Sequence, residues 1–205
     1  IVPSPAMLFR SHQAEQALGC PVDPGTLERA MTGHQEVRTR LVAMFDGLAD
    51  GGSAVQAYAA ALAARVLDPD AWFACLEAEP QPPAPPNGVP ILLSGSVIPS
   101  MQAVLDLVDA GCRIVSDDTS TGMRSARRRV EPGSTDPLDA LARSLVAPEP
   151  HGPERLGDVD RPAAVARRAA EAGARAAVLL RQKFCDPQAL DDPALIAALR
   201  AVGIP

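Results

Sequence analysis

The chain has 205 residues, of which 47% are hydrophobic, and its formal net charge is −6 with a pI near 5.0. This acidic balance argues against a nucleic-acid-binding protein. No apolar run is long enough to span a membrane, and four cysteines without close pairing argue against a disulfide framework. We therefore expect a globular cytoplasmic protein with no membrane or nucleic-acid partner.

The first third of the chain has the pattern of consecutive helices. Apolar residues recur at three- and four-residue spacing over 26–49, and Ser53 is placed to cap a second helix over 54–66. A third helix is expected from residue 68, and the proline-rich stretch 79–90 is interpreted as a connector. We therefore predict a helical subdomain with its connector over residues 1–85 and an α/β domain over residues 86–205.

Beyond residue 85, predicted strands alternate with predicted helices. The strands are expected at 89–94, 113–116 and 176–180, and the helices at 100–110, 137–145, 161–173 and 193–202. This alternation predicts the α/β class, with a flavodoxin-like (Rossmann-like) parallel sheet beside the N-terminal helical subdomain. Because the chain opens without Met and closes where a new strand is expected, we expect a fragment whose α/β domain is incomplete at the C-terminus.

Polar residues stand at the ends of all three predicted strands. The three segments are Ser94-Gly95-Ser96, residues 117–122 and residues 183–186. Because the carboxyl ends of parallel strands meet at one edge, where open α/β sheets bind ligands, we expect one site there. The first segment is interpreted either as a phosphate cradle or as a tight turn.

The segment after the second strand combines carboxylates with arginines. Asp117 and Asp118 can bind a cation, cap a turn or hold Arg124 by a charge-assisted hydrogen bond, and we favour the pairing with Arg124. The local basic cluster fits either a phosphate-bearing small molecule or a solvated helix face, and it comprises Arg124, Arg127, Arg128 and Arg129.

Cys185 follows the third predicted strand. A cysteine at the carboxyl edge of a sheet is better placed for chemistry than one inside a helix, although a lone cysteine is more often a packing residue. Cys20, Cys75 and Cys112 are interpreted as structural.

These motifs together resemble a known family. The stretches LLSG (92–95), SDDTSTGMR (116–124) and KFCDP (183–187) are similar to motifs of 2-hydroxyacyl-CoA dehydratase subunits, a family that includes the ATP-dependent benzoyl-CoA reductase subunits. The stretch 18–31 is similar to the helical segment between the two flavodoxin-like domains of that family. The resemblance therefore implies a D-component-like subunit, of which this chain holds the helical part and most of the second α/β domain.

The resemblance also implies a binding site for an acyl-CoA thioester at the strand ends. The residues expected to contact it are Ser94, Gly95, Asp118, Thr121, Gly122, Arg124, Arg127 and Arg128. The implied partners are a homologous second subunit and an ATP-dependent iron–sulfur activator protein. The implied reaction is an oxygen-sensitive, single-electron one: an electron delivered to the thioester carbonyl gives a ketyl radical, which expels a β-placed leaving group or accepts a further electron.

A [4Fe-4S] cluster is the cofactor that the resemblance implies, held by three cysteines, the last of which Cys185 matches. Family members carry a Pro-Cys-Pro-Cys-like segment where this chain has residues 147–152, APEPHG. Glu149 or His151 can replace the missing thiolates as iron ligands. Two alternatives stay open: a partner subunit of the same family without a working cluster, and a plain phosphate- or nucleotide-binding flavodoxin-like domain.

Overall fold

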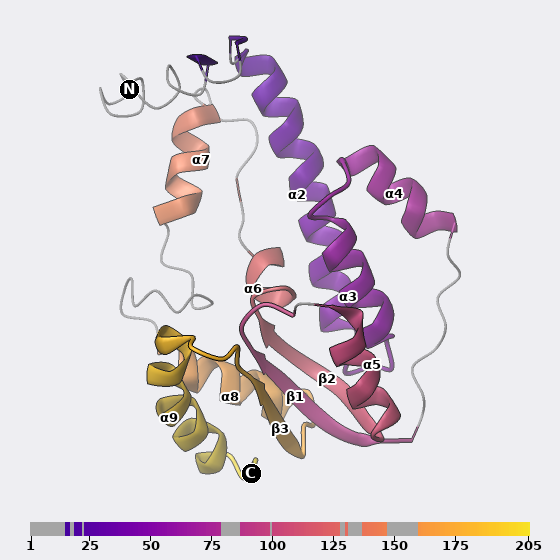
Figure 1. The fold of residues 1–205 in the computed structure, drawn as a ribbon, viewed down its shortest axis with the longest axis vertical. Coiled ribbons are helices and arrows are strands. Elements are labelled where there is room, and N and C mark those ends of the chain that lie inside the picture. The colour runs from indigo at the N-terminus through magenta and orange to yellow at the C-terminus, as the bar shows by residue number, and fades with distance from the viewer. Residues whose placement is uncertain are drawn as a thin grey trace.

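The computed structural model describes residues 15–16, 19–21, 23–78, 87–98, 100–127, 130, 137–146 and 160–205. The elements are α2 (Pro24–Asp46), α3 (Ala54–Ala63), α4 (Pro69–Ala78), β1 (Val89–Gly95), α5 (Met101–Asp109), β2 (Cys112–Thr119), α6 (Met123–Ala126), α7 (Pro137–Val146), α8 (Arg161–Glu171), β3 (Ala176–Leu180) and α9 (Asp186–Ala201). Helices flank a three-stranded sheet on both faces, so the predicted α/β class is confirmed (Figure 1). The domain boundary near residue 85 lies outside the described residues and stays a prediction.

The sheet has the strand order β2-β1-β3, and β1 pairs in parallel with both neighbours. All three predicted strands and their parallel pairing are confirmed. The second strand is longer than predicted, because β2 continues to Thr119 and includes Asp117 and Asp118. Charged residues are tolerated at the buried end of this strand because each carboxylate finds hydrogen-bond donors there.

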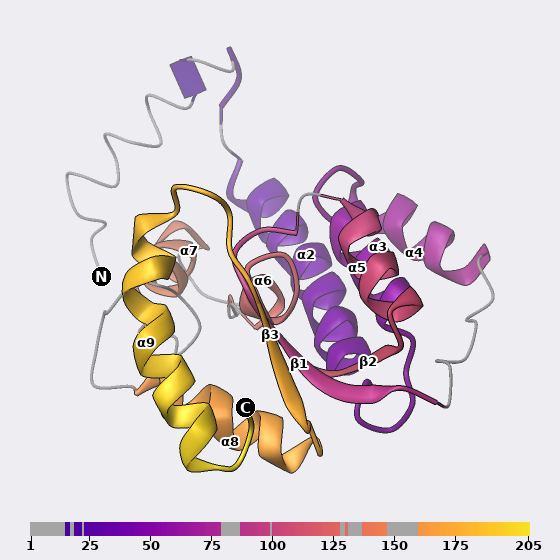
Figure 2. The same ribbon diagram turned by 60° about the horizontal axis from the view of Figure 1, so that its bottom comes forward.

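Alternate side chains of the strands supply two separate cores, as the two-residue period of a strand requires. Ile91 and Leu93 of β1 pack against α2, α3 and α5, whereas Leu92 packs on the opposite face against α8 and α9. Figure 2 shows the sheet between these two helical layers. The larger core therefore joins the N-terminal helices directly to the sheet.

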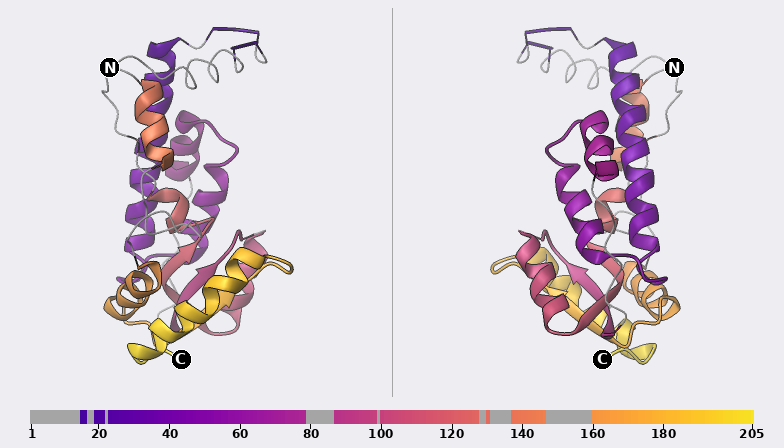
Figure 3. Two further views of the ribbon diagram at one scale, coloured as in Figure 1. Left: turned by 90° about the vertical axis from the view of Figure 1, so that its left-hand side faces the viewer. Right: turned by 90° about the vertical axis from the view of Figure 1, so that its right-hand side faces the viewer.

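The longest helix, α2, begins and ends at local signals. The side chain of Asp23 caps it by accepting a hydrogen bond from the Thr26 amide at 2.7 Å, and Pro24 occupies the first turn, where its missing N–H has no cost. Its N-terminal half packs on α7 through Met31 and Ala140, and α7 lies beside α2 in the side views (Figure 3). Its C-terminal half supplies Phe45 to the main core.

The final helix starts earlier than the sequence pattern predicted. We expected it to begin at Pro193, but α9 begins at Asp186, directly after Cys185. Pro187 fits the first turn of α9, and Pro193 is accommodated inside the helix with the loss of one backbone hydrogen bond. Cys185 therefore lies at the N-terminus of a helix rather than in a long loop.

All four cysteines of the chain are free in the structure. In the described part of the chain, no helix is both long and apolar enough to cross a lipid bilayer.

Candidate functional site

Asp118 is the centre of a buried ionic cluster at the carboxyl edge of the sheet. Its Oδ2 atom accepts hydrogen bonds from Ser94 Oγ and Arg124 Nη2, both at 2.9 Å, and from Arg161 Nη2 at the start of α8. Arg168 Nη2 lies 3.7 Å from Oδ1. The pairing predicted between the Asp pair and Arg124 is therefore confirmed, with Asp118 as the partner.

The surroundings of Asp118 favour its charged form. Burial by itself raises the pKa of this carboxyl group, but the guanidinium groups of Arg124 and Arg161 outweigh burial and hold the pKa below its ordinary value. Within the described residues, Asp118 Oδ1 and the Nε atoms of Arg124 and Arg161 have no hydrogen-bond partner. Asp118 is thus an ionised group that ties β1, α6 and α8 to β2.

The neighbouring Asp117 points to the opposite face and has neutral donors. Its Oδ2 accepts a short hydrogen bond from the Tyr58 hydroxyl of α3, and its Oδ1 accepts from the backbone amides of Met123 at 2.6 Å and Thr119 at 3.2 Å. Burial raises the pKa of Asp117 to about 6, although these hydrogen bonds oppose the rise. Burial and the nearby Asp117 carboxylate also raise the pKa of Tyr58 well above its ordinary value.

At the two glycines of the expected site, the backbone lies so close to neighbouring atoms that a side chain would collide with them. A Cβ atom at Gly122 would lie 2.4 Å from Asp117 Oδ1, and one at Gly95 would lie 2.0 Å from the backbone oxygen of Leu180. Thr121 is buried, and its Oγ1 accepts a hydrogen bond from the Ile98 amide at 2.7 Å. These residues pack the ends of β1, β2 and β3 together.

The predicted basic cluster does not form one exposed patch among the described residues. Arg124 is buried on Asp118, whereas Arg127 forms an ion pair with Asp46 of α2 at 3.0 Å. Arg128, which was also expected at the site, lies outside the described residues. Arg127 and Arg168 both line a cavity of about 300 Å³ between α2, β2 and α8, which Asp117 also lines.

The described residues do not fit the ligand set of an iron–sulfur cluster. Cys185 is half-buried at the N-terminus of α9, whereas Cys112 opens β2 at the opposite edge of the sheet, and Cys75 lies in α4. In the described part of the chain, no three His, Cys, Asp or Glu residues come together as a metal site. The other two expected ligands, Glu149 and His151, lie outside the described residues.

Sequence reasoning missed the two long-range partners of the aspartates. Tyr58 is 59 residues from Asp117, and Arg161 is 43 residues from Asp118. A signal for Arg161 was present, because it lies four residues before the buried Val165 and therefore on the buried stripe of α8. Tyr58 carries no comparable local signal, because its spacing is that of an ordinary core residue.

The fold and this edge define a parallel α/β protein whose strand ends form a rigid, charged site. The model of the family described as 2-hydroxyglutaryl-CoA dehydratase, D-component (HGD-D), matches residues 11–205. The chain belongs to this family, which confirms the resemblance inferred from its motifs. No curated protein matches the chain.

Proposed function

We propose that this chain is a cytoplasmic, D-component-like subunit of an enzyme that acts on acyl-CoA thioesters, as a dehydratase (a lyase) or a related benzoyl-CoA-type reductase. The observation that carries the proposal is the family match over residues 11–205. The polar carboxyl edge of the sheet supports it, because ligands of open α/β sheets bind at that edge.

The reaction that the family resemblance implies is a one-electron reduction of the thioester carbonyl under anaerobic conditions. An ATP-dependent iron–sulfur activator protein supplies the electron, and the resulting ketyl radical loses its β-placed group or takes up a further electron. A homologous second subunit completes the enzyme. In this scheme the present chain binds and orients the thioester and keeps water from it.

The residues proposed to serve the substrate fall into two groups. Ser94, Asp118 and Arg124 form the buried ionic cluster, so we assign them the role of holding the edge rigid. Gly95 allows the backbone of β1 to approach the end of β3, and Gly122 leaves room for the Asp117 side chain. Thr121, Arg127 and Arg128 are the members proposed to face the thioester.

A second candidate function is that of a partner subunit that lacks a working [4Fe-4S] cluster. The observation that favours it is the sequence of residues 147–152, APEPHG, which has no cysteine where family members carry a Pro-Cys-Pro-Cys-like segment. A cluster on this chain then requires Glu149 or His151 as a ligand in addition to Cys185. The two candidate functions are compatible with the same fold and differ in whether this chain binds iron.

Iron content separates the candidates. The chain is purified anaerobically with its partner subunit, reconstituted with iron and sulfide, and assayed for iron and for turnover of a 2-hydroxyacyl-CoA with the activator and ATP. For a cluster on this chain, we expect Cys185→Ser to abolish the iron that this chain retains, and Glu149→Ala or His151→Ala to shift its visible spectrum. Cys112→Ser is the matched control and should leave the iron unchanged.

Two results would decide against the first candidate. Full iron retention in Cys185→Ser would show that this chain does not hold the cluster. Continued turnover of the same variant would then identify the chain as a supporting subunit. Absence of turnover with every acyl-CoA tested, in an assembled and iron-loaded complex, would contradict the proposed activity itself.

A further inference from the structure

A second hollow lies apart from the ionic cluster, between α2, the end of α3 and the turn that follows β2. It has a volume of about 370 Å³, which is within the range of small-ligand pockets. Three basic side chains line it, namely His34, Arg38 and Arg65, together with the hydroxyl residues Thr121 and Ser125. Among the described residues that line it there is no carboxylate.

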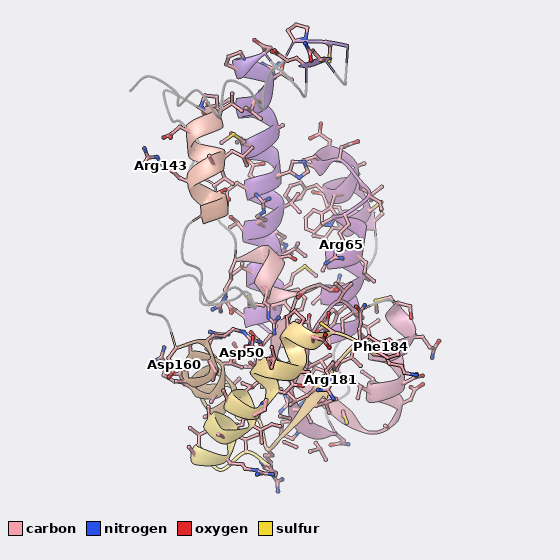
Figure 4. All side chains as sticks on the ribbon, turned by 60° about the vertical axis from the view of Figure 1, so that its left-hand side comes forward. Asp50, Arg65, Arg143, Asp160, Arg181 and Phe184 are labelled. Atoms are coloured by element: carbon pink, nitrogen blue, oxygen red, sulfur yellow. The ribbon has the colours of Figure 1, made fainter. Side chains whose placement is uncertain are left out.

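The basic side chains come from two different helical segments. His34 and Arg38 are four residues apart on α2 and so share one face of that helix. Arg65 lies in the turn after α3, where its Nη2 atom donates a hydrogen bond to the backbone oxygen of Ser120 at 3.1 Å. Figure 4 shows Arg65 between the two helices. Because Ser120 directly follows β2, the hollow opens beside the carboxyl edge of the sheet.

Arg65 and His34, two of the basic side chains at this rim, differ from the predicted basic cluster in their partners. Arg124 and Arg127 each have an aspartate partner. In the part of the chain that the structure describes, neither Arg65 nor His34 forms an ion pair. Convergent donors without a lining carboxylate attract an anion, and a guanidinium group is well suited to phosphate.

The floor of the hollow is apolar. Val37, Leu41, Ala61 and Ala126 line it, and all four are buried in the main core. The Thr121 hydroxyl accepts a hydrogen bond from the Ile98 amide, and a hydroxyl group can also donate one. An apolar floor under a basic rim matches a ligand that carries both a ring system and phosphate groups.

We infer that this hollow binds the phosphorylated adenosine head of the CoA thioester, with Arg65 and His34 as phosphate-binding residues. This inference rests on the proposed function, because that function supplies CoA as the ligand. The sequence favours a cluster of arginines after β2 for the phosphate contacts. The inference assigns these contacts instead to the hollow beside α2 and α3. The thioester arm then runs from the groove past Thr121 along the carboxyl edge.

Calorimetric titration of the full chain tests the inference, with CoA, adenosine 3′,5′-bisphosphate, ADP and inorganic phosphate as the probes. We expect Arg65→Gln to weaken binding of CoA and of the bisphosphate about tenfold, the usual effect of removing one charged hydrogen bond. His34→Gln should weaken both by a smaller factor, and added salt should weaken the wild type. Arg200→Gln is the matched control: it removes the same charge near the end of α9 and should bind as the wild type does.

The outcomes separate this inference from the proposed function. Unchanged CoA affinity in Arg65→Gln, with weaker binding in an Arg127→Ala, Arg128→Ala double variant, would overturn the inference and leave the proposed function standing. Equal affinity for inorganic phosphate and the bisphosphate would overturn the assignment to a nucleotide head. Binding of ADP that depends on Arg65, without binding of CoA, would overturn the assignment to CoA and also contradict the proposed function.

Discussion

At the scale of single residues, the two adjacent aspartates of β2 show how environment separates identical side chains. Asp118 has arginine partners, whereas Asp117 is surrounded by the Tyr58 hydroxyl and backbone amides. The pKa of Asp118 is therefore lowered, and burial raises that of Asp117 to about 6. The difference follows from the alternation of a strand, which directs neighbouring side chains to opposite faces.

The raised pKa of Asp117 predicts a pH-dependent stability. Between its ordinary value of 3.8 and about 6, the folded chain keeps a proton that the unfolded chain has lost. The stabilisation is therefore complete below pH 4 and is lost as the pH rises through 6, and its size is roughly 3 kcal/mol. We expect Asp117→Asn to remove this decline, as measured by urea unfolding between pH 4 and pH 7.

Asp118 serves as the internal control for this measurement, because its lowered pKa acts in the opposite sense. Its contribution is present above pH 4 and is lost only under more acidic conditions. A wild-type stability that stays level between pH 4 and pH 7 while Asp117→Asn behaves identically would contradict the assigned burial of Asp117.

At the scale of elements, the charged contacts of Asp118 join helices that the apolar core leaves separate. Arg124 follows β2 and Arg161 opens α8, so one carboxylate fixes the position of both segments at the carboxyl edge. Arg161 also lies 3.8 Å from Asp191 of α9. The cluster therefore positions α8 and α9 relative to the sheet in addition to their packing on Leu92 and Val115.

Removing the carboxylate should be strongly destabilising. Asp118→Ala removes the counter-charge of the buried Arg124 and leaves the buried Arg161 with only Asp191, 3.8 Å away, so we expect a loss of about 3 to 5 kcal/mol in the free energy of unfolding. Adding Arg161→Met removes one of those charges and should recover part of the loss. Denaturant titration gives both values. Glu171→Ala, which removes an exposed partner of Arg167 on the same helix, is the control and should leave the free energy nearly unchanged.

Recovery is the informative part of that experiment. If the double variant is less stable than Asp118→Ala alone, the arginine stabilises the fold by packing or by Asp191, and the uncompensated-charge explanation is wrong.

At the scale of the whole molecule, the N-terminal helices and the sheet share one apolar core. Phe45 and Tyr58 meet edge to face at 5.2 Å, and this pair belongs to the same cluster as Ile91, Leu93 and Ile114 of the sheet. We propose that the boundary near residue 85 divides the chain into a helical and an α/β segment without making them independent folding units.

A truncated chain tests this proposal. Residues 87–205 alone would expose the sheet face that α2 and α3 cover, so we expect no cooperative thermal unfolding transition and rapid proteolysis compared with the full chain. A sharp transition with a native-like circular dichroism spectrum would show that the α/β segment folds by itself. The full chain, digested in parallel, is the reference.

The sequence by itself determined the class of fold, the three strands, most helices and the edge at which polar residues gather. It could do so because apolar periodicity, caps and strand-end loops are local, and because parallel strands bring their carboxyl ends together. The same local patterns placed the start of α9 too late, since a proline inside a helix is compatible with packing but looks like a start signal. The family motifs likewise needed no tertiary information.

Only the tertiary structure decided which partner each charged group takes. Asp118 meets Arg161, Asp117 meets Tyr58, and Arg65 reaches the turn after β2, all across more than forty residues. A local pattern cannot specify such pairs, because they depend on the faces that packing brings together. The physical reason is that a buried charge must find a counter-charge or donor wherever the fold places one, whatever the separation along the chain.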